Sequence, residues 1–388
     1  MAVTLRPLHA GLRDGAIEQV PFAASDGTVL GLCRVVPSDG GRDRPVVLLL
    51  HGHTASSDMF VLPEARNLVE VLLDAGYEPW LLDWRGSCRL PYNEGRVRYT
   101  YDDVALYDIP EAVARVRDRI GDRQLFVVAH CIGAMSLSMS MAAGLVPGLA
   151  GVVAQGVFLT PKLPGGTRLR MHLGGELIRS RLTHHPVDFR RAGLWSKYTP
   201  MFALASIGAK CPDPTCQILH NSAWGIGASL FVHENLSPRT HDRLPELFGS
   251  APIWSLPHLR KIELAHTMVR WSDRDRRYER LPENALDGAD RIDCPLMLLS
   301  GSENGLWLDS NRLCHELLAS RHPRLDVRYV EVPGYGHADT FIGQSAALDV
   351  FGPIVEFLDE QRAADRPAAA PRSIVGRAKR ALATPVDA

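Results

Sequence analysis

The sequence predicts an α/β fold, with a mostly parallel sheet flanked by helices and a large, mainly helical insertion that forms a lid. Continuous apolar runs of strand length, such as residues 45–50, alternate with amphipathic helical segments over the first third of the chain. This alternation breaks between residues 160 and 292, where Pro, His, Trp and Met become frequent. The strand pattern returns at residues 294–300. A parallel sheet that is interrupted by an insertion and then completed accounts for these observations.

The individual elements are expected in a regular order along the chain. A hairpin turns at Ser25-Asp26-Gly27, because turn residues separate two apolar runs there. The expected strands span residues 17–23, 29–36, 45–50, 78–83, 124–129, 294–300 and 325–332, and the expected helices span residues 64–75 and 108–120 and begin again at 133. Strands that alternate with helices are joined by crossover connections, which produce a parallel sheet.

The same pattern divides the chain into segments. Residues 1–159 and 293–361 are expected to form the two parts of the core, with residues 160–292 as the lid. Residues 362–388 are rich in Ala, Pro and Arg and are expected to be a disordered tail. The insertion also carries many large apolar side chains, of which most are expected to pack within the lid and a few to line a pocket: Met201, Phe202, Leu204, Trp224, Ile226, Leu230, Phe231 and Trp254.

Composition limits the classes of partner. The 388 residues carry a formal net charge of −1, so no overall field attracts nucleic acid or a membrane surface. No apolar run approaches the roughly 20 residues of a membrane span, and no signal peptide is recognised at the N-terminus. Seven cysteines, an odd number spread over a long chain, are not a disulfide framework. We therefore expect a cytoplasmic protein without a membrane span that acts on a small molecule and needs no cofactor.

Two cysteines in the insertion raise the question of a metal site. Cys211 and Cys216 are close in sequence, and His220 follows them. Three ligands on one short segment lack a fourth, whereas structural zinc sites have four. Paired or merely buried thiols are therefore the preferred interpretation, and no metal ion is predicted.

The segment around Cys131 is the main candidate for chemistry. A buried strand is followed by Ala129-His130-Cys131-Ile132-Gly133 and then by a helix, which is the pattern of a nucleophile elbow. The turn tolerates only small residues two positions on either side of the nucleophile, and Ala129 and Gly133 meet this demand. The N-terminus of the following helix is expected to lower the pKa of the thiol. The alternative is a buried structural cysteine.

Two further segments supply the expected partners of Cys131. His51-Gly52 follows a strand, and the loop there would donate the backbone N–H of His53 to an oxyanion, together with the N–H of Ile132. His337 lies on a Gly-rich loop after the last apolar strand, where a general base belongs. The three segments together favour a catalytic role for Cys131 over a structural one.

The third member of the catalytic group is expected in the loop after residue 300. Glu303 is the favoured acid because its charge could orient and stabilise an imidazolium. Asn304 is the alternative, since a Cys-His-Asn arrangement is workable for a thiolate. Asp309 and Asp339 are more remote candidates that are expected to brace loops.

These motifs resemble the acid-lipase branch of the α/β-hydrolases, a branch related to polyhydroxyalkanoate synthases. The resemblance rests on the elbow and on Asp83-Trp-Arg-Gly86, Tyr101-Asp-Asp103 and Tyr107-Asp-Ile-Pro110. Other motifs are similar to the hydrolase module fused to cholesterol-oxidase-like GMC oxidoreductases: Cys211-x4-Cys216, His233-Glu-Asn-Leu236, Thr240-His241, Phe248-Gly249, Gly301-x-Glu-Asn304, Val332-Pro-Gly-Tyr-Gly-His337-x-Asp339 and Phe341-Ile-Gly343. The resemblance covers roughly residues 15 to 360 and implies an acyl-directed hydrolase fold with an extended lid. A flavin role is not implied, because no Gly-x-Gly-x-x-Gly follows a strand.

A cysteine nucleophile alters the expected chemistry. Its acyl intermediate is a thioester, and a thiolate leaves more easily than an alkoxide, so activated acyl donors are expected: esters with good leaving groups, thioesters or lactones. The substrate is expected to be small and apolar, with a carrier-bound thioester as one form. Hydrolysis is the first expectation. The alternatives are an acyltransferase or cyclase that passes the acyl group to a non-water acceptor, and a non-catalytic binding module.

Overall fold

The computed structural model describes residue 8 and residues 11–90, 98–169, 171–172, 184–185, 199, 203, 206–207, 211–221, 229–252 and 255–364. Several of the expected lid residues (Met201, Phe202, Leu204, Trp224, Ile226 and Trp254) and the tail after residue 364 lie outside these ranges. Leu230 and Phe231 lie within them, and both are buried.

A nine-stranded sheet forms the centre of the molecule. Its order is β1-β3-β5-β4-β6-β7-β10-β11, and β2 also pairs with β3. The strands from β5 to β11 in this order are parallel, whereas β1, β2 and β5 pair with β3 in antiparallel fashion. The strands span β1 Ala16–Gln19, β2 Phe22–Ala23, β3 Val29–Val36, β4 Val46–Leu50, β5 Glu78–Asp83, β6 Leu125–His130, β7 Gly151–Gln155, β10 Leu296–Gly301 and β11 Val327–Val332. The sheet is therefore mostly parallel, as the sequence predicts.

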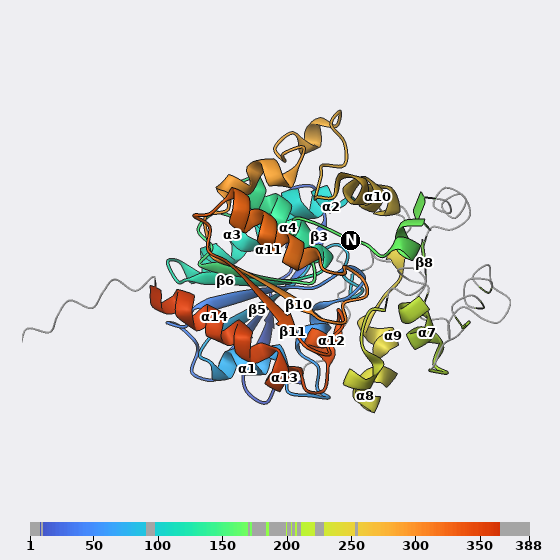
Figure 1. Cartoon of the computed structure of the whole chain (residues 1–388). Coiled ribbons are helices and arrows are strands. Elements are labelled where there is room, and N and C mark those ends of the chain that lie inside the picture. The colour runs from blue at the N-terminus through green and yellow to red at the C-terminus, as the bar shows by residue number, and fades with distance from the viewer. Residues whose placement is uncertain are drawn as a thin grey trace, which may run out of the picture.

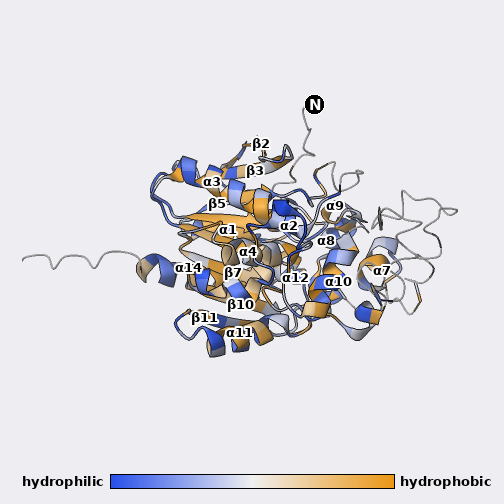
Figure 2. Cartoon of the chain, turned by 90° about the horizontal axis from the view of Figure 1, so that it is seen from above, coloured by the Kyte–Doolittle hydropathy of each residue, from blue (hydrophilic) through white to orange (hydrophobic). Residues whose placement is uncertain are grey.

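Helices cover both faces of this sheet. Figure 1 shows α3, α4 and α11 on one face and α1 and α14 on the other. The principal helices span α1 Leu68–Asp74, α3 Ile109–Ile120, α4 Ile132–Ala142, α11 Ser310–Arg321 and α14 Phe351–Ala364, and shorter ones span α2 Tyr101–Asp103, α12 Asp339–Ile342 and α13 Ala346–Asp349. In Figure 2 the hydrophobic colour is concentrated on the central strands, in agreement with the complete burial of β4 to β7 and β10. Apolar runs without alternation have this form because both faces of their strands are covered.

In Figure 1 the part of the insertion with β8, α7, α8 and α9 lies at one end of the sheet, whereas its last part packs against α4. The described elements of the insertion are β8 His184–His185, α7 Pro214–Asn221, η5 His233–Asn235, α8 Pro238–Asp242, α9 Leu244–Leu247, β9 Ala251–Pro252, α10 Leu256–Ala265, η7 Arg276–Tyr278 and η8 Ala285–Arg291. The sheet stops at Gln155 and resumes at Leu296, so the interruption predicted from the sequence is present. Among the described residues, no helix has both the length and the apolar character needed to cross a membrane.

Local sequence accounts for the differences between expected and observed elements. The helix expected from residue 64 begins at Leu68, because the Asn67 side chain accepts the backbone N–H of Glu70 and caps it. The helix before β6 begins earlier than expected. Thr100 and Asp103 form a capping box, and a π-helical turn, Val104–Asp108, leads into α3.

Candidate active site

Cys131 occupies the turn between β6 and α4 in a conformation that is unusual for a residue with a side chain. Its φ is 56° and its ψ is −127°, in the left-handed half of backbone space. Such a conformation costs of order 1–3 kcal/mol and persists where the surrounding structure holds it, often at functional sites. The Cys131 N–H donates to the carbonyl of Gln155 at 3.0 Å. A Cβ on Gly133 would lie 2.4 Å from the His51 carbonyl oxygen, so the glycine predicted at this position is required.

Three N–H donors surround the Cys131 sulfur. The backbone N–H groups of His53 and Ile132, predicted as oxyanion donors, both hydrogen-bond to it. The third is the indole Nε1–H of Trp307, whose nitrogen lies 3.3 Å from the sulfur. The structure thus brings both predicted backbone donors to the elbow and adds a side-chain donor.

The His337 imidazole lies beside the thiol. Potential ligand atoms of His130, Cys131 and His337 all lie within 4.8 Å of one another. The His130 and His337 rings have centroids 4.5 Å apart, and Gln155 contacts His130 Nδ1 through its carbonyl and donates to the His337 carbonyl at 2.9 Å. Cys131 and His337 therefore meet as predicted, with His130 and Gln155 as neighbours.

Gly156 forms the surface against which the His337 ring rests. Its φ is +87°, and a Cβ built on it would lie 2.5 Å from Cε1 and 2.7 Å from Nδ1 of His337. A side chain at this position would displace the imidazole. The observed position of the His337 ring therefore requires glycine at residue 156.

The structure does not bring Glu303 to His337. Glu303 is exposed, and its carboxylate accepts a hydrogen bond from the neighbouring Ser302 hydroxyl at 3.3 Å. Its backbone N–H donates to the Tyr335 carbonyl at 2.8 Å, which ties down the main chain while the side chain faces solvent. Among the described residues, neither ring nitrogen of His337 has a hydrogen-bond partner.

Asn304 is buried but also makes no contact with His337. Its side-chain oxygen accepts the backbone N–H groups of Leu306 and Trp307, at 3.3 and 3.2 Å, and its amide donates to the Ser300 hydroxyl at 3.2 Å. The side chain thus fixes the turn that presents the Trp307 indole to Cys131. Its amide also lies 3.5 Å from the carbonyl oxygen of Gly156, on which the His337 ring rests, so Asn304 contacts the supports of both the thiol and the imidazole.

The two remote acidic candidates brace loops, as expected. Asp339 accepts the Gly336 backbone N–H at 3.0 Å and the Asn235 amide at 2.7 Å. Asp309 pairs with Lys162 at 2.7 Å and with Arg312 at 2.5 Å. The Asp339 carboxylate therefore fixes the His337 loop, and the Asp309 carboxylate fixes the start of α11.

Burial dominates the electrostatics of the Cys131–His337 pair. It raises the pKa of the Cys131 thiol to about 11, although hydrogen bonds from Trp307, Ile132 and His53 act to lower it. Burial, together with the neighbouring His130, holds the pKa of His337 well below its usual range. The pair is therefore a neutral thiol beside a neutral imidazole at pH 7. The expectation that the helix N-terminus lowers the thiol pKa is wrong in its net result, because desolvation outweighs the N–H donors.

Trp84, in the Asp83-Trp-Arg-Gly86 motif, packs against the His51-Gly52 loop. The Trp84 ring stacks on His51 with centroids 5.0 Å apart, and its indole N–H donates to the His51 carbonyl at 2.9 Å. The Arg85 guanidinium forms a buried ion pair with Asp108 at 2.6 Å. Of these motif residues, Trp84 thus supports the oxyanion loop directly, whereas Arg85 and Asp108 pair with each other.

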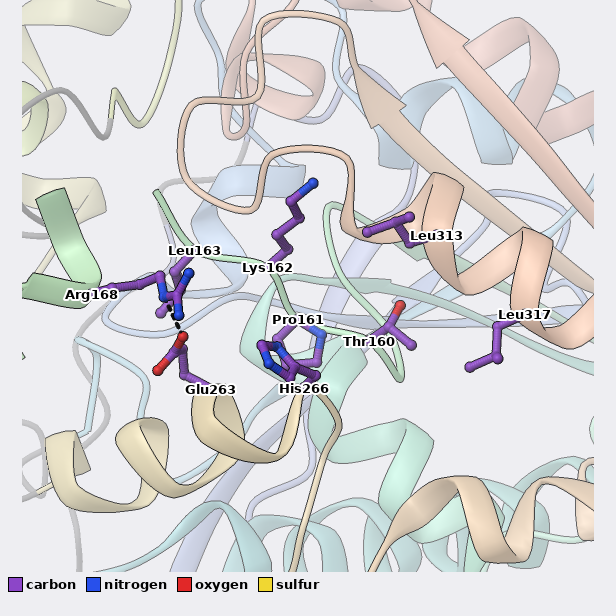
Figure 3. Close-up of a pocket in the computed structure, with 9 residues that line it drawn as sticks. All are labelled: Thr160, Pro161, Lys162, Leu163, Arg168, Glu263, His266, Leu313 and Leu317. Carbon is purple, nitrogen blue, oxygen red and sulfur yellow. Dashed lines mark ion pairs between the residues drawn. The ribbon is translucent and has the colours of Figure 1, made fainter. Parts of the chain in front are cut away.

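A separate cavity of about 440 Å³ lies between the start of the insertion, α10 and α11. Figure 3 shows the ion pair of Arg168 and Glu263 on one side and Leu313 and Leu317 on the other. Neither Cys131 nor His337 lines it, and its Lys162 is already paired with Asp309. The paired charges leave this cavity without a feature that selects a charged ligand.

Sequence reasoning missed Trp307, His130 and Gly156. The sequence pattern could have indicated two of them, because His130 directly precedes the nucleophile and Gly156 directly follows β7. No such pattern indicates Trp307, because its contact with Cys131 spans 176 residues of sequence. Cys131, His130 and His337 also offer three ligand atoms for a metal, but hydrogen-bond donors already surround the sulfur.

Comparison with known proteins agrees with the observed fold. A family model described as the alpha/beta hydrolase fold matches residues 45–166. A probable lipase of Schizosaccharomyces pombe is 23% identical over 88% of this chain and 77% of its own length. Human gastric triacylglycerol lipase is 32% identical, but the match covers only 30% of this chain and 32% of the lipase.

Solved structures show the same fold at low sequence identity. A thermostable carboxyl esterase from Bacillus coagulans superposes with a TM-score of 0.58 at 14% identity, covering 89% of this chain and 98% of the esterase. A lipase in its open form superposes with a TM-score of 0.57 at 18% identity, covering 89% and 99%. The chain therefore has the α/β-hydrolase fold, with lipases among its sequence relatives.

Proposed function

We propose that this protein is an esterase- or thioesterase-type hydrolase in which Cys131 is the nucleophile and His337 the general base. The supporting observation is the placement of Cys131 on a left-handed turn, with two backbone N–H groups at its sulfur and His337 within reach. The fold and the lipase relatives support hydrolysis of an apolar ester.

The neutral state of the pair determines the first step. His337 accepts the thiol proton as the Cys131 sulfur attacks the substrate carbonyl carbon. The carbonyl oxygen becomes an oxyanion and takes the N–H donors of His53 and Ile132. Collapse of this adduct breaks the bond to the leaving group, which receives the proton from His337, and an acyl thioester remains on Cys131.

Hydrolysis repeats the same steps with water. His337 accepts a proton from a water molecule, the resulting oxygen attacks the thioester carbonyl, and the thiolate leaves and regains the proton. The acid product departs and the neutral thiol is restored. No carboxylate contacts His337 among the described residues, so we assign these steps to a Cys131–His337 dyad, with Asn304 and Trp307 as positioning residues.

The leaving group decides which substrates react productively. A thiolate leaves more readily than an alkoxide, so the adduct on a simple alkyl ester returns to substrate. Thioesters, including carrier-bound ones, phenyl or enol esters and lactones avoid this return. Buried Leu230 and Phe231 next to the His337 loop, where the Leu230 carbonyl accepts the Ala338 N–H at 2.8 Å, favour an apolar acyl group.

Acyl transfer is the second candidate, because a thioester is open to amines and carbon nucleophiles as well as to water. Incubation with p-nitrophenyl esters and acyl thioesters, followed by mass spectrometry, separates the outcomes. An adduct on Cys131 that is lost rapidly to water supports hydrolysis, whereas one that persists and discharges to an added amine or alcohol supports transfer or cyclisation. A protein that forms no adduct is a binding module, and the proposal is then wrong.

Two substitutions sharpen this experiment. Cys131→Ser is expected to lose nearly all turnover, because a neutral serine depends more on an oriented imidazole than a thiol does. A fivefold gain on simple alkyl esters with the preferred reaction intact would contradict the role of thiol chemistry. Cys294→Ala removes another buried thiol before β10 and serves as the matched control.

A further inference from the structure

A second cluster of metal-binding side chains lies outside the catalytic site. Cys211, His233 and His241 offer ligand atoms that all lie within 4.8 Å of one another. The Cys211 sulfur lies 3.4 Å from Nε2 of His241, and the two imidazole rings have centroids 4.8 Å apart. The thiol of Cys216 is hydrogen-bonded to that of Cys211, and both cysteines are free. One thiol and two imidazoles therefore converge, and the Cys216 thiol lies against the Cys211 thiol just outside this group.

The local structure of the first segment places both sulfurs. Asp213 precedes α7, and its carboxylate accepts the Cys216 N–H at 2.9 Å, which sets Cys216 in the first helical turn. The Asp213 backbone N–H donates to the Cys211 sulfur at 3.4 Å, and the Gln217 amide donates to the Cys211 carbonyl at 2.8 Å. Hydrogen bonds of this kind orient a metal ligand and favour its thiolate form.

The second segment places the two imidazoles. His233 begins a 3₁₀ turn, His233–Asn235, and His241 lies in α8, whose start is capped by Ser237. His233 Nδ1 is buried and has no hydrogen-bond partner among the described residues. A buried ring nitrogen without a partner is costly, and a metal ion would satisfy it.

The dimensions agree with tetrahedral zinc. Zn–S bonds of about 2.3 Å and Zn–N bonds of about 2.0–2.1 Å place sulfur and nitrogen ligands about 3.6 Å apart in a tetrahedron. The observed separation between the Cys211 sulfur and His241 Nε2 is 3.4 Å. A two-thiol, two-imidazole set is one of the usual ligand sets of structural zinc sites.

We propose that Cys211, His233 and His241 bind one Zn²⁺ ion and that the Cys216 thiol, which lies against Cys211, turns in as the fourth ligand of a closed structural site. Binding releases the two thiol protons to solvent, so the two thiolates neutralise the charge of the ion. The sequence alone offered Cys211, Cys216 and His220 and no fourth ligand. The fold brings two imidazoles from a separate segment to Cys211, and the proposal differs from the sequence-based expectation on this ground.

The site has a consequence for the active site, because the segment with the two imidazoles contacts the His337 loop. Asn235 donates to the Gly334 carbonyl at 2.8 Å and to the Asp339 carboxylate at 2.7 Å. An ion bound by His233 and His241 would hold the segment on both sides of Asn235 and thereby stabilise its contact with the His337 loop. We expect the zinc-free protein to retain the sheet but to hold the His337 loop less firmly.

Metal analysis of the purified full chain tests the proposal. About one zinc per chain is expected in the wild type, and less than about one-tenth in Cys211→Ser and in His241→Gln, since each loses a ligand. His220→Gln tests the other imidazole near the site: His220 lies on α7, its Nδ1 contacts the Ser229 hydroxyl at 2.8 Å, and its buried Nε2 has no hydrogen-bond partner among the described residues. Zinc content is expected to be unchanged in this variant, because His220 lies outside the group of converging ligand atoms. Replacement by Co²⁺ should give the absorption of a tetrahedral thiolate site.

A measurement on the wild type covers the case in which the variants fail to fold. Differential alkylation should show Cys211 and Cys216 protected until a chelator removes the metal, and both modified afterwards. Zinc-free protein, equal zinc in wild type and Cys211→Ser, or a Cys211–Cys216 disulfide in place of the metal would each overturn the proposal. Loss of zinc from His220→Gln with full zinc in Cys216→Ser would overturn the assignment of the fourth ligand.

Discussion

Replacing Gly156 by alanine tests whether the position of the His337 ring controls activity. A Cβ there would lie 2.5 Å from the ring, whereas ordinary contact begins near 3.4 Å. The imidazole must therefore move by about 0.9 Å, the difference between these distances. A displacement of about 1 Å at a reacting group costs on the order of 100-fold in rate, or about 3 kcal/mol in the activation free energy. We expect kcat/KM on a p-nitrophenyl ester to fall by about that factor.

The matched control is Gly27→Ala. Gly27 has φ of +85° against +87° for Gly156, so alanine meets the same backbone penalty, about 1–2 kcal/mol, in both places. Nothing lies within 4 Å of a Cβ at Gly27, which is remote from the site. Gly156→Ala should lose more free energy of unfolding than Gly27→Ala, measured by denaturant titration, because the collision with His337 adds to the backbone penalty, and only Gly156→Ala should lose activity. Equal activity of the two variants would refute the reasoning.

Three more predictions follow from the contacts and burial of the site. Glu303→Gln should keep kcat/KM within about twofold of the wild type, because an exposed surface charge contributes little; a loss of 100-fold or more would restore the carboxylate to the mechanism. The rate of alkylation of Cys131 by iodoacetamide should increase with pH, with a midpoint of about 11; a midpoint below 8 would contradict the neutral pair. Trp307→Phe should lower this rate at least about tenfold at fixed pH, because a hydrogen bond to a charged acceptor contributes about 1.5–3 kcal/mol. Burial lowers the pKa of four histidines, His51, His130, His220 and His258, to about 4. The unfolded chain therefore binds more protons than the folded chain between pH 6.5 and 4, and the free energy of unfolding decreases as the pH falls, by up to about 1.4 kcal/mol per pH unit for each histidine. Denaturant midpoints at pH 7 and 5 measure the combined effect, and equal midpoints would contradict it.

The elbow, the oxyanion loop and the His337 loop could be predicted because each depends on short stretches of sequence. A buried strand, a turn with small residues and a helix specify the position of Cys131 almost by themselves. His51-Gly52 and His337 follow strands whose order in the sheet is set by crossover rules. Three local patterns therefore sufficed to assemble the main groups.

The partners of the imidazole and the state of the thiol could not be predicted in this way. The side chain of Asn304 turns back onto its own loop, and this path depends on the packing of Trp307 against Cys131. The thiol pKa depends on burial by the whole surrounding structure, which outweighs the local helix N-terminus. The ligands at His233 and His241 join Cys211 only through tertiary folding.

The central claim is that Cys131 carries the acyl group, and peptide mass spectrometry tests it most directly. The wild type is mixed with a p-nitrophenyl ester, quenched in acid during turnover and digested, and the peptide with Cys131 is examined. We predict a mass increase equal to the acyl group minus one hydrogen on Cys131, present in Cys294→Ala and absent in Cys131→Ala. Turnover by Cys131→Ala at the wild-type rate, or acylation at another residue, would contradict the account.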